Sequence, residues 1–158
     1  SAITTFVGQN LGAEEFDRAK KGARFGILCS LLIAEGIGVI TYVFSPVFIG
    51  AFCDSQEAIA FGVDKAHICA LFFCLLAATH CLSAVLRGAG RAMVPMVVML
   101  SVWCVLRVSI LWIAVPITQS INTVNWVYPI TWSISTVVLL IYYRKSDWLH
   151  SFQRETAK

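Results

Sequence analysis

The sequence predicts an all-α, polytopic membrane helix bundle with four complete transmembrane helices and the end of a fifth. Of its 158 residues, 58% are hydrophobic and 13% are charged, and the mean hydropathy is +0.78. Soluble domains average roughly 45 to 50% apolar and about 25% charged residues. The apolar residues are also gathered into long blocks. These observations argue against a water-soluble fold.

Four apolar blocks are long enough to cross a bilayer. A hydrocarbon core of roughly 30 Å requires about 20 apolar residues, and they must be helical because hydrocarbon leaves no partner for backbone polar groups. The shortest continuous run, Trp126–Tyr143, would be roughly 27 Å long, and the residues from Ile121 onward extend it. The predicted spans cover residues 25–52, 66–86, 92–117 and 122–143.

The distribution of Lys and Arg predicts how the spans are oriented. Four lie in residues 14–24, one in 53–65, two in 87–91, none in 118–125 and four in 144–158. This alternation is the pattern that the positive-inside rule requires of segments on alternating sides of a membrane. The strip at 13–24, the 87–91 turn and the tail at 144–158 are therefore predicted to be cytoplasmic.

Residues 1–12 are expected to be the end of a helix that begins upstream. They are mildly apolar, do not start with Met and lack the regions of a signal peptide. On this interpretation residues 1–158 form part of one transmembrane lobe, with no soluble catalytic domain. The motifs GxSxG, HExxH and GxxxxGK[ST] are also absent. The sequence therefore predicts no enzyme and no catalytic residues.

Small and hydroxyl side chains predict how the helices pack. Ala34 and Gly38 stand at i and i+4, which permits close approach of another helix, although tolerance on a lipid-facing side is an equal alternative. Two hydroxyl pairs with the same spacing are expected to face neighbouring helices or a wet cavity. These pairs are Thr79 with Ser83, and Thr131 with Ser135.

Glu35 is the first of three candidates for an ion or substrate path. Ionisable residues inside spans are costly and are usually functional. Glu35 lies roughly 15 Å into its helix, near mid-membrane. It is expected to take up a proton or Na⁺, or to pair with a cationic substrate. The alternative is a structural carboxyl group that is hydrogen-bonded to a neighbouring helix.

Arg107 and His80 are the other two candidates. Arg107 lies about 22 Å into its span from the same side as Glu35, and it is expected to influence that carboxyl group by proximity. Its stronger alternative is structural, with a cation-π contact to Trp103 one turn earlier. His80 is expected either to line a polar path or to bond a backbone carbonyl group.

Metal and nucleic-acid sites are not predicted. His67, Cys74 and Cys81 recur every seven residues, but seven residues advance about 10.5 Å, whereas metal bonds are about 2.0 to 2.3 Å long. No CxxC occurs among the six cysteines, so no disulfide framework is predicted. The net charge of +3 is explained by the cytoplasmic segments.

The glycine-rich segment RGAGR, Arg87–Arg91, is predicted to be a tight cytoplasmic turn. It follows a membrane helix and not a strand, which argues against a phosphate loop. Gly88 and Gly90 permit positive φ angles. The two arginines are expected to sit at the lipid headgroups.

Four stretches resemble successive signatures of the C-terminal half of bacterial multidrug and toxic compound extrusion (MATE) transporters. They read TTFVGQNLGAEEFDRAKKGARFG, VLRGAGRAMVPM, SVWCVLRVSILW and WVYPITWSISTVVLLIYY. The first two are the more specific, and they place the family's motif turns at Gly8, Gln9, Gly12, Arg87, Gly88 and Gly90. The resemblance runs through all 158 residues, and it implies the end of helix 8 through helix 12 of a partial C-terminal lobe.

The resemblance also implies a mechanism and partners. Such transporters alternate between outward and inward opening and export cationic amphipathic compounds in exchange for H⁺ or Na⁺. The implied partners are the lipid bilayer, the missing N-terminal lobe and small cationic or amphipathic substrates, with no cofactor beyond the coupling ion. The implied location is the bacterial inner (plasma) membrane, with a cytoplasmic C-terminus.

The sequence departs from the family at one place. Some members carry an acidic ion-binding residue in the helix before the Leu-Arg-Gly turn, whereas residues 75–82 contain no Asp or Glu. Arg107 matches an arginine common in helix eleven, and Glu35 matches no family motif. Two alternatives remain open: a lipid-linked saccharide flippase of the same superfamily, and a non-transporting membrane anchor or assembly subunit.

Overall fold

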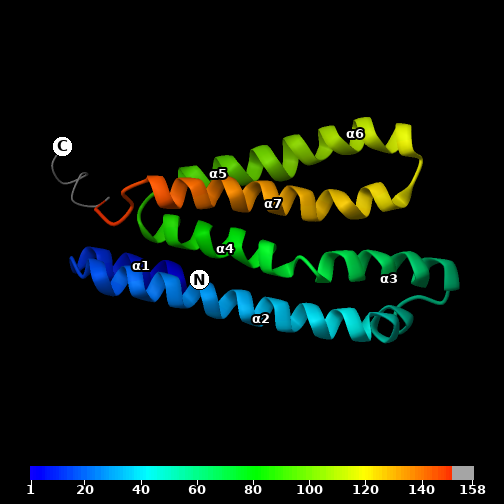
Figure 1. Ribbon diagram of the computed structural model, residues 1–158, viewed down its shortest axis with the longest axis horizontal. Helices are drawn as coiled ribbons and strands as arrows, with labels where there is room; N and C mark the ends of the chain where they lie inside the picture. Colours follow the sequence, from blue (N-terminus) through cyan, green and yellow to red (C-terminus); the bar gives the residue numbers. More distant parts are fainter. Residues whose placement is uncertain (151–158) are drawn as a thin grey trace.

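A computed structural model describes residues 1–150 and shows an elongated helix bundle, with no strand in that range (Figure 1). The predicted all-α membrane bundle is thus confirmed as a fold class. The helices are α1 (Ala2–Gly12), α2 (Phe16–Gly50), α3 (Gln56–Ala70), α4 (Phe73–Gly88), α5 (Met93–Met99), a π-helix η1 (Leu100–Leu106), α6 (Arg107–Thr118) and α7 (Ile121–Lys145).

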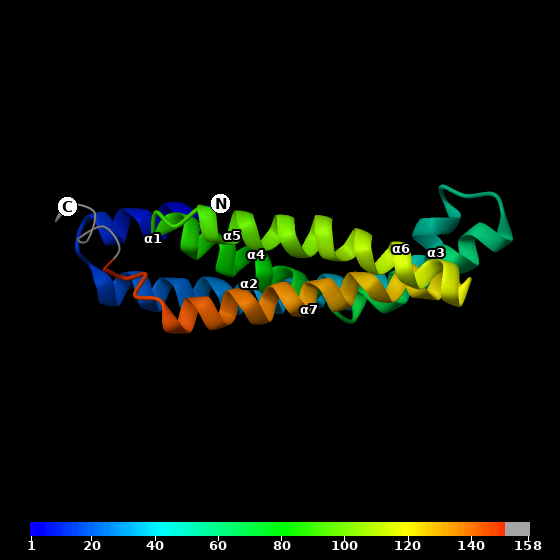
Figure 2. The same cartoon turned by 90° about the horizontal axis from the view of Figure 1, so that it is seen from above.

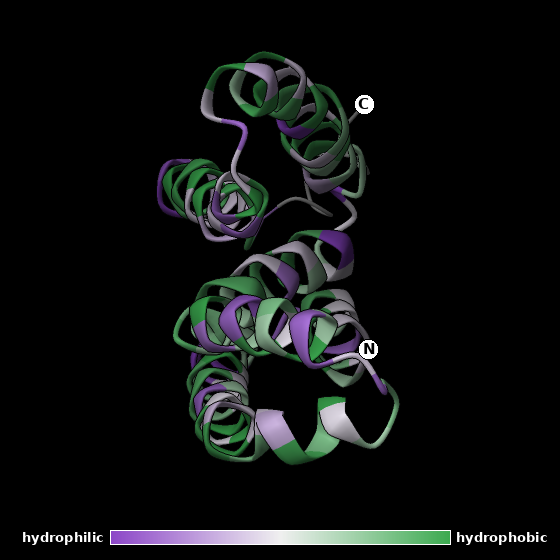
Figure 3. Cartoon of the chain, turned by 90° about the vertical axis from the view of Figure 1, so that its right-hand side faces the viewer, coloured by the Kyte–Doolittle hydropathy of each residue, from purple (hydrophilic) through white to green (hydrophobic). Residues whose placement is uncertain are grey.

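Three helical rods are long and apolar enough to cross a membrane: α2, the continuous rod Met93–Thr118, and α7. The bent pair α3 and α4 makes a fourth if it counts as one span. The most apolar windows of α2 and of Met93–Thr118 are each 6% buried inside the structure, against 44% for α7. α7 is therefore central, whereas α2 and Met93–Thr118 present apolar surface outward. Figure 3 shows hydrophobic residues along the rods.

The turns gather at two opposite ends of the bundle. The α1–α2 turn, the α4–α5 turn and the end of α7 share one end, and the α2–α3 and α6–α7 turns share the other (Figures 1 and 2). The cation-rich segments thus lie together, as the predicted orientation requires. Residues 151–158 of the predicted tail lie outside the described residues.

The helices of the structure differ from the predicted segments at two places. The strip at 13–24 is mostly helical, because α2 begins at Phe16 and the only break is a short turn around Glu14, where φ is 58°. Lys, Arg and Ala are good helix formers. The charged residues of this strip therefore indicate that it is exposed, and they do not indicate an irregular backbone.

The predicted span at 66–86 is two helices bent by 55° at Leu71–Phe72. The first of them, α3, begins ten residues earlier than predicted, where the side chain of Ser55 accepts a 3.5 Å hydrogen bond from the Ala58 N–H. This is an N-cap, and it satisfies one of the free donors at the helix start. The region predicted as an outer loop is therefore largely helical.

Pro46 explains one contact between α2 and α3. Proline has no N–H, so the carbonyl oxygen of Tyr42 has no donor four residues further on. Ser45 Oγ donates to this oxygen at 3.3 Å, and Nε2 of His67 lies 3.0 Å from it. The ring of His67 also stacks on Tyr42, with centroids 4.2 Å apart.

Glycines permit two close helix contacts. A methyl group added to Gly38 would lie 2.5 Å from the Ala70 carbonyl oxygen, and one added to Gly88 would lie 2.6 Å from the Thr4 carbonyl oxygen. A methyl group added to Gly8 would lie 3.2 Å from the Gly88 carbonyl oxygen. Small residues thus let α2 approach α3, and α1 approach α4, as the small-residue pattern predicts.

The 87–91 turn uses its two glycines differently. Gly90 has a φ of 77°, which confirms the predicted positive φ. Gly88 is helical, so its predicted positive φ is wrong, and its role is to admit α1. Arg91 donates a 2.8 Å hydrogen bond from Nη1 to the Tyr142 hydroxyl group. The turn is therefore tied to the end of α7.

We predict that Gly88→Ala destabilises the protein, because its methyl group would overlap the α1 backbone. Overpacking of this kind costs about 1 to 3 kcal/mol. Thermal unfolding of the detergent-solubilised protein measures the loss. Gly36→Ala is the matched control, since nothing lies within 4 Å of that position, and it should gain about 0.5 to 1 kcal/mol of helix stability. Equal melting temperatures for the two variants would contradict the contact.

Candidate functional site

Buried hydroxyl groups join α4 to α7. Thr79 Oγ1 lies 3.2 Å from Ser135 Oγ and 2.8 Å from Thr136 Oγ1. Thr79 and Thr136 also donate to the Leu75 carbonyl oxygen, at 3.1 and 2.9 Å. The prediction that the hydroxyl pairs face neighbouring helices is confirmed. In hydrocarbon these bonds hold α4 and α7 in one register.

Trp103 links the same network to the third rod. It lies in the π-helix η1, and its Nε1 donates a 3.2 Å hydrogen bond to Ser135 Oγ. Short π-helical segments inside α-helices occur frequently at functional sites. Arg107 follows η1 directly. The π turn thus places an aromatic ring and a cation together against α7.

Arg107 is bound mainly to α7. Its Nε and Nη2 donate to Thr131 Oγ1 at 3.3 and 2.6 Å. Its guanidinium carbon lies 5.5 Å from the Trp103 ring centroid and 4.6 Å from that of Tyr128. The predicted cation-π contact with Trp103 is confirmed. These contacts give Arg107 a structural role between α6 and α7.

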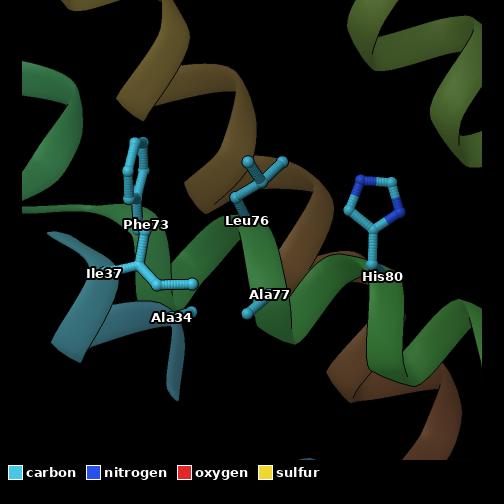
Figure 4. Close-up of a pocket in the computed structure, with 6 residues that line it drawn as sticks. All are labelled: Ala34, Ile37, Phe73, Leu76, Ala77 and His80. Atoms are coloured by element: carbon cyan, nitrogen blue, oxygen red, sulfur yellow. The ribbon is translucent and has the colours of Figure 1, made fainter. Parts of the chain in front are cut away.

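His80 lies on an exposed face of α4. It meets the Trp103 ring edge-on, with centroids 5.6 Å apart. Within residues 1–150 His80 makes no hydrogen bond, so the predicted bond to a backbone carbonyl group is wrong. It lines an apolar cavity of about 270 Å³ between α2 and α4, together with Ala34, Ile37, Phe73, Leu76 and Ala77 (Figure 4).

Glu35 occupies a second, separate cavity, next to the break between α3 and α4. This cavity of about 140 Å³ is lined by Glu35, Gly38, Val39, Tyr42, Ala70 and Leu71. The Oε2 atom of Glu35 is buried and has no hydrogen-bond partner in the described part of the chain. The carboxyl group as a whole is not isolated, because the thiol group of Cys74 on α4 lies within hydrogen-bonding range of it, so the structural alternative applies to one oxygen and not to Oε2.

The surroundings of Glu35 suit a proton or a monovalent cation. The thiol group of Cys74 is the one side chain of α4 within hydrogen-bonding range of the carboxyl group among the described residues. α3 ends at Ala70, so its C-terminal carbonyl groups and the negative end of its dipole face this region. Broken membrane helices commonly coordinate Na⁺ or H⁺ with such carbonyl groups. Among the described residues, no cluster of three or more His, Cys, Asp or Glu could hold a metal ion.

The structure does not bring all three predicted residues together. His80 and Arg107 both contact the Trp103 ring. Glu35 instead faces α3 and the helix break, whereas Arg107 bonds to α7. The expected influence of Arg107 on the Glu35 carboxyl group therefore finds no support in the contacts.

The sequence patterns do not single out Tyr128 and Lys65. Nevertheless, Lys65 Nζ lies 4.6 Å from the Tyr128 ring centroid. One sequence signal could have identified Tyr128. It stands three residues before Thr131, and this spacing puts both residues on the same face of a helix.

The fold and these sites define a class of protein: a multi-pass membrane helix bundle with ionisable groups held inside its spans. The MatE family model matches residues 1–113, and the chain belongs to the MatE family.

Two curated relatives are similar to this chain. A probable multidrug resistance protein, YoeA of Bacillus subtilis, is 28% identical over 145 residues, which are 90% of this chain and 31% of the relative. A probable multidrug resistance protein, NorM of Thermotoga maritima, is 30% identical over 103 residues, 65% of this chain and 22% of the relative. The chain thus spans about a third or less of the relatives that it matches.

We predict that Arg107→Ala lowers the amount of folded protein in the membrane. It removes two hydrogen bonds from a charged group to Thr131, and bonds of this kind contribute about 1.5 to 3 kcal/mol each. Immunoblotting and size-exclusion chromatography of the solubilised protein measure the loss. The exposed Arg18 offers a control, since Arg18→Ala should accumulate normally. Normal accumulation of Arg107→Ala with lost transport would contradict the structural role.

Proposed function

We propose that this chain is part of the C-terminal lobe of a secondary active transporter, which exports small cationic or amphipathic drugs or metabolites in exchange for H⁺ or Na⁺. The observation that carries the proposal is the MatE match over residues 1–113, within which Glu35 has a buried oxygen without a partner. The two relatives described as probable multidrug resistance proteins support the substrate class.

Glu35 is the residue that we assign to ion coupling. A lone carboxylate inside hydrocarbon is costly, and binding a proton or Na⁺ removes its charge. The neutral carboxyl group then stabilises the packing of α2 against the break between α3 and α4. Release of the ion restores the negative charge and weakens this packing. A bend of 55° between two consecutive helices is a natural place for such a change during alternating access.

The exposed apolar surfaces support the proposed partners. The outward faces of α2 and of Met93–Thr118 are almost wholly unburied within this chain. Hydrocarbon chains of lipid, or helices of a second lobe, are the surroundings that stabilise such faces. We propose that part of this surface meets the N-terminal lobe and the remainder meets the bilayer.

We predict that Glu35→Gln in the full-length transporter abolishes ion-driven efflux while the protein still accumulates in the membrane. Glutamine keeps the shape of the side chain but cannot take up a proton or hold a cation by charge. Efflux of a fluorescent cationic dye from efflux-deficient cells is measured with and without an ionophore that dissipates the ion gradient.

The matched control for this experiment is Glu57→Gln, which changes an exposed acid in the first turn of α3. Its efflux should equal that of the unmodified transporter. Equal losses of efflux and of accumulation in Glu35→Gln would instead support a packing role. Full efflux by Glu35→Gln would remove Glu35 from the coupling mechanism.

We further predict that the C-terminus and the cation-rich turns are cytoplasmic. Cys53 lies in the α2–α3 turn, at the end opposite to the cation-rich turns (Figure 1). It should react with a membrane-impermeant maleimide in intact spheroplasts. In a Cys53→Ser background, Lys145→Cys should react only after permeabilisation. Labelling of Lys145→Cys in intact spheroplasts would reverse the orientation.

A further inference from the structure

Two cations share one aromatic ring where α3, α6 and α7 meet. Lys65 Nζ lies 4.6 Å from the Tyr128 ring centroid, and the guanidinium carbon of Arg107 lies 4.6 Å from the same centroid. Figures 1 and 2 show α3, α6 and the start of α7 at the same end of the bundle. Two like charges thus contact the same ring.

Neither cation has a carboxylate partner within residues 1–150. The ion pair formed there, Asp147 with His150, lies in the segment after α7. A cation-π contact stabilises a cation but does not neutralise its charge. Like charges that contact one ring repel one another. The pair Lys65 and Arg107 is therefore an unbalanced positive centre.

Several hydrogen-bond donors around this centre are unused. Arg107 employs Nε and Nη2 on Thr131, and no described residue accepts a bond from its Nη1 or from Lys65 Nζ. Asn125 is only 3% exposed, and its Nδ2 has no partner in the described structure. Asn125 stands three residues before Tyr128 and so shares its face of α7.

The centre lies away from the ends of the helices that carry it. Arg107 is roughly 16 Å along the helix from the end of α6, and Lys65 is about 13 Å from the start of α3. Lys65 is exposed, so the centre is open on that side. Because Arg107 belongs to the apolar rod Met93–Thr118, we expect a ligand that carries its negative group on an apolar body.

We infer that Lys65, Arg107 and Asn125 bind an oxyanion, a carboxylate or phosphate group, of an amphipathic molecule. Charge-assisted hydrogen bonds from Arg and Lys to such oxygens are short and strong. The oxyanion supplies the missing negative charge, and its oxygen atoms accept hydrogen bonds from the unused N–H groups. The group can belong to a lipid headgroup or to an organic anion dissolved in water. This site is distinct from the Glu35 cavity, and its binding does not depend on ion-coupled transport.

The test compares two probes with the same apolar chain and opposite charge. Dodecyl phosphate and dodecyltrimethylammonium are titrated into the full-length protein in a neutral detergent, and tryptophan fluorescence reports binding. We expect dodecyl phosphate to bind at the centre, whereas any binding of the ammonium probe should be independent of Lys65. Lys65→Gln should weaken the binding of dodecyl phosphate by about tenfold, since a hydrogen bond to a charged group contributes about that much, and should leave the ammonium probe unchanged.

Two variants control for the positive charge of residue 65 and for the position of the cation that is removed. Lys65→Arg keeps the positive charge and should keep the affinity for dodecyl phosphate. Lys145→Gln removes an exposed cation at the opposite end of the bundle (Figure 1), and it should also bind normally. Arg107 is left intact, because its loss is expected to impair folding.

Competition identifies the source of the oxyanion. Displacement of dodecyl phosphate by phosphatidylglycerol assigns the site to a lipid headgroup, and displacement by phenyl phosphate assigns it to a soluble organic anion. An unchanged affinity for dodecyl phosphate in Lys65→Gln would overturn the inference, and so would an equal loss of affinity for both dodecyl probes in that variant.

Discussion

Hydrocarbon offers no hydrogen bonds to a polar group, and this constraint accounts for most polar contacts in the structure. Where Pro46 removes a backbone donor, Ser45 and His67 approach the carbonyl group left behind. The hydroxyl group of Thr79 bonds both to its own helix and to Ser135 on α7. Polar side chains thus hold together helices that have no hydrophobic reason to prefer each other over lipid.

Close approach of backbones is the second consequence of the same solvent. Because lipid is as apolar as leucine, helix contacts depend on van der Waals packing and favour small residues. Gly88 admits α1, and Gly38 admits α3. The glycines of the family signatures at Gly8 and Gly88 therefore act in packing. The ionisable residues to which we assign transport chemistry by proposal lie elsewhere, and one of them, Glu35, stands outside the family motifs.

The spans were predictable because a bilayer imposes both a length and a composition on any helix that crosses it. The contacts of the hydroxyl pairs followed from the same constraint, but the identity of each partner did not, since spacing along one helix says nothing about its neighbour. Two irregularities could not be predicted, because neither contains a glycine or a proline: the break at Leu71–Phe72 and the π-helix Leu100–Leu106. The meeting of Lys65, Tyr128 and Arg107 joins three separate helices and is visible only in three dimensions.

Two buried atoms inside the described spans are exceptions to the rule of satisfied polar groups: Oε2 of Glu35 and Nδ2 of Asn125. A buried polar atom without a hydrogen-bond partner costs free energy. Each of these two atoms therefore marks a place where an ion, a water molecule or a ligand can bind. Glu35 stands beside a helix break, where we propose that a cation binds. Asn125 stands one turn before Tyr128, the ring that Lys65 and Arg107 contact, where we infer that an anion binds. Under these two proposals, opposite charges at separate sites allow a coupling ion and a negatively charged group to bind without competing for the same residues.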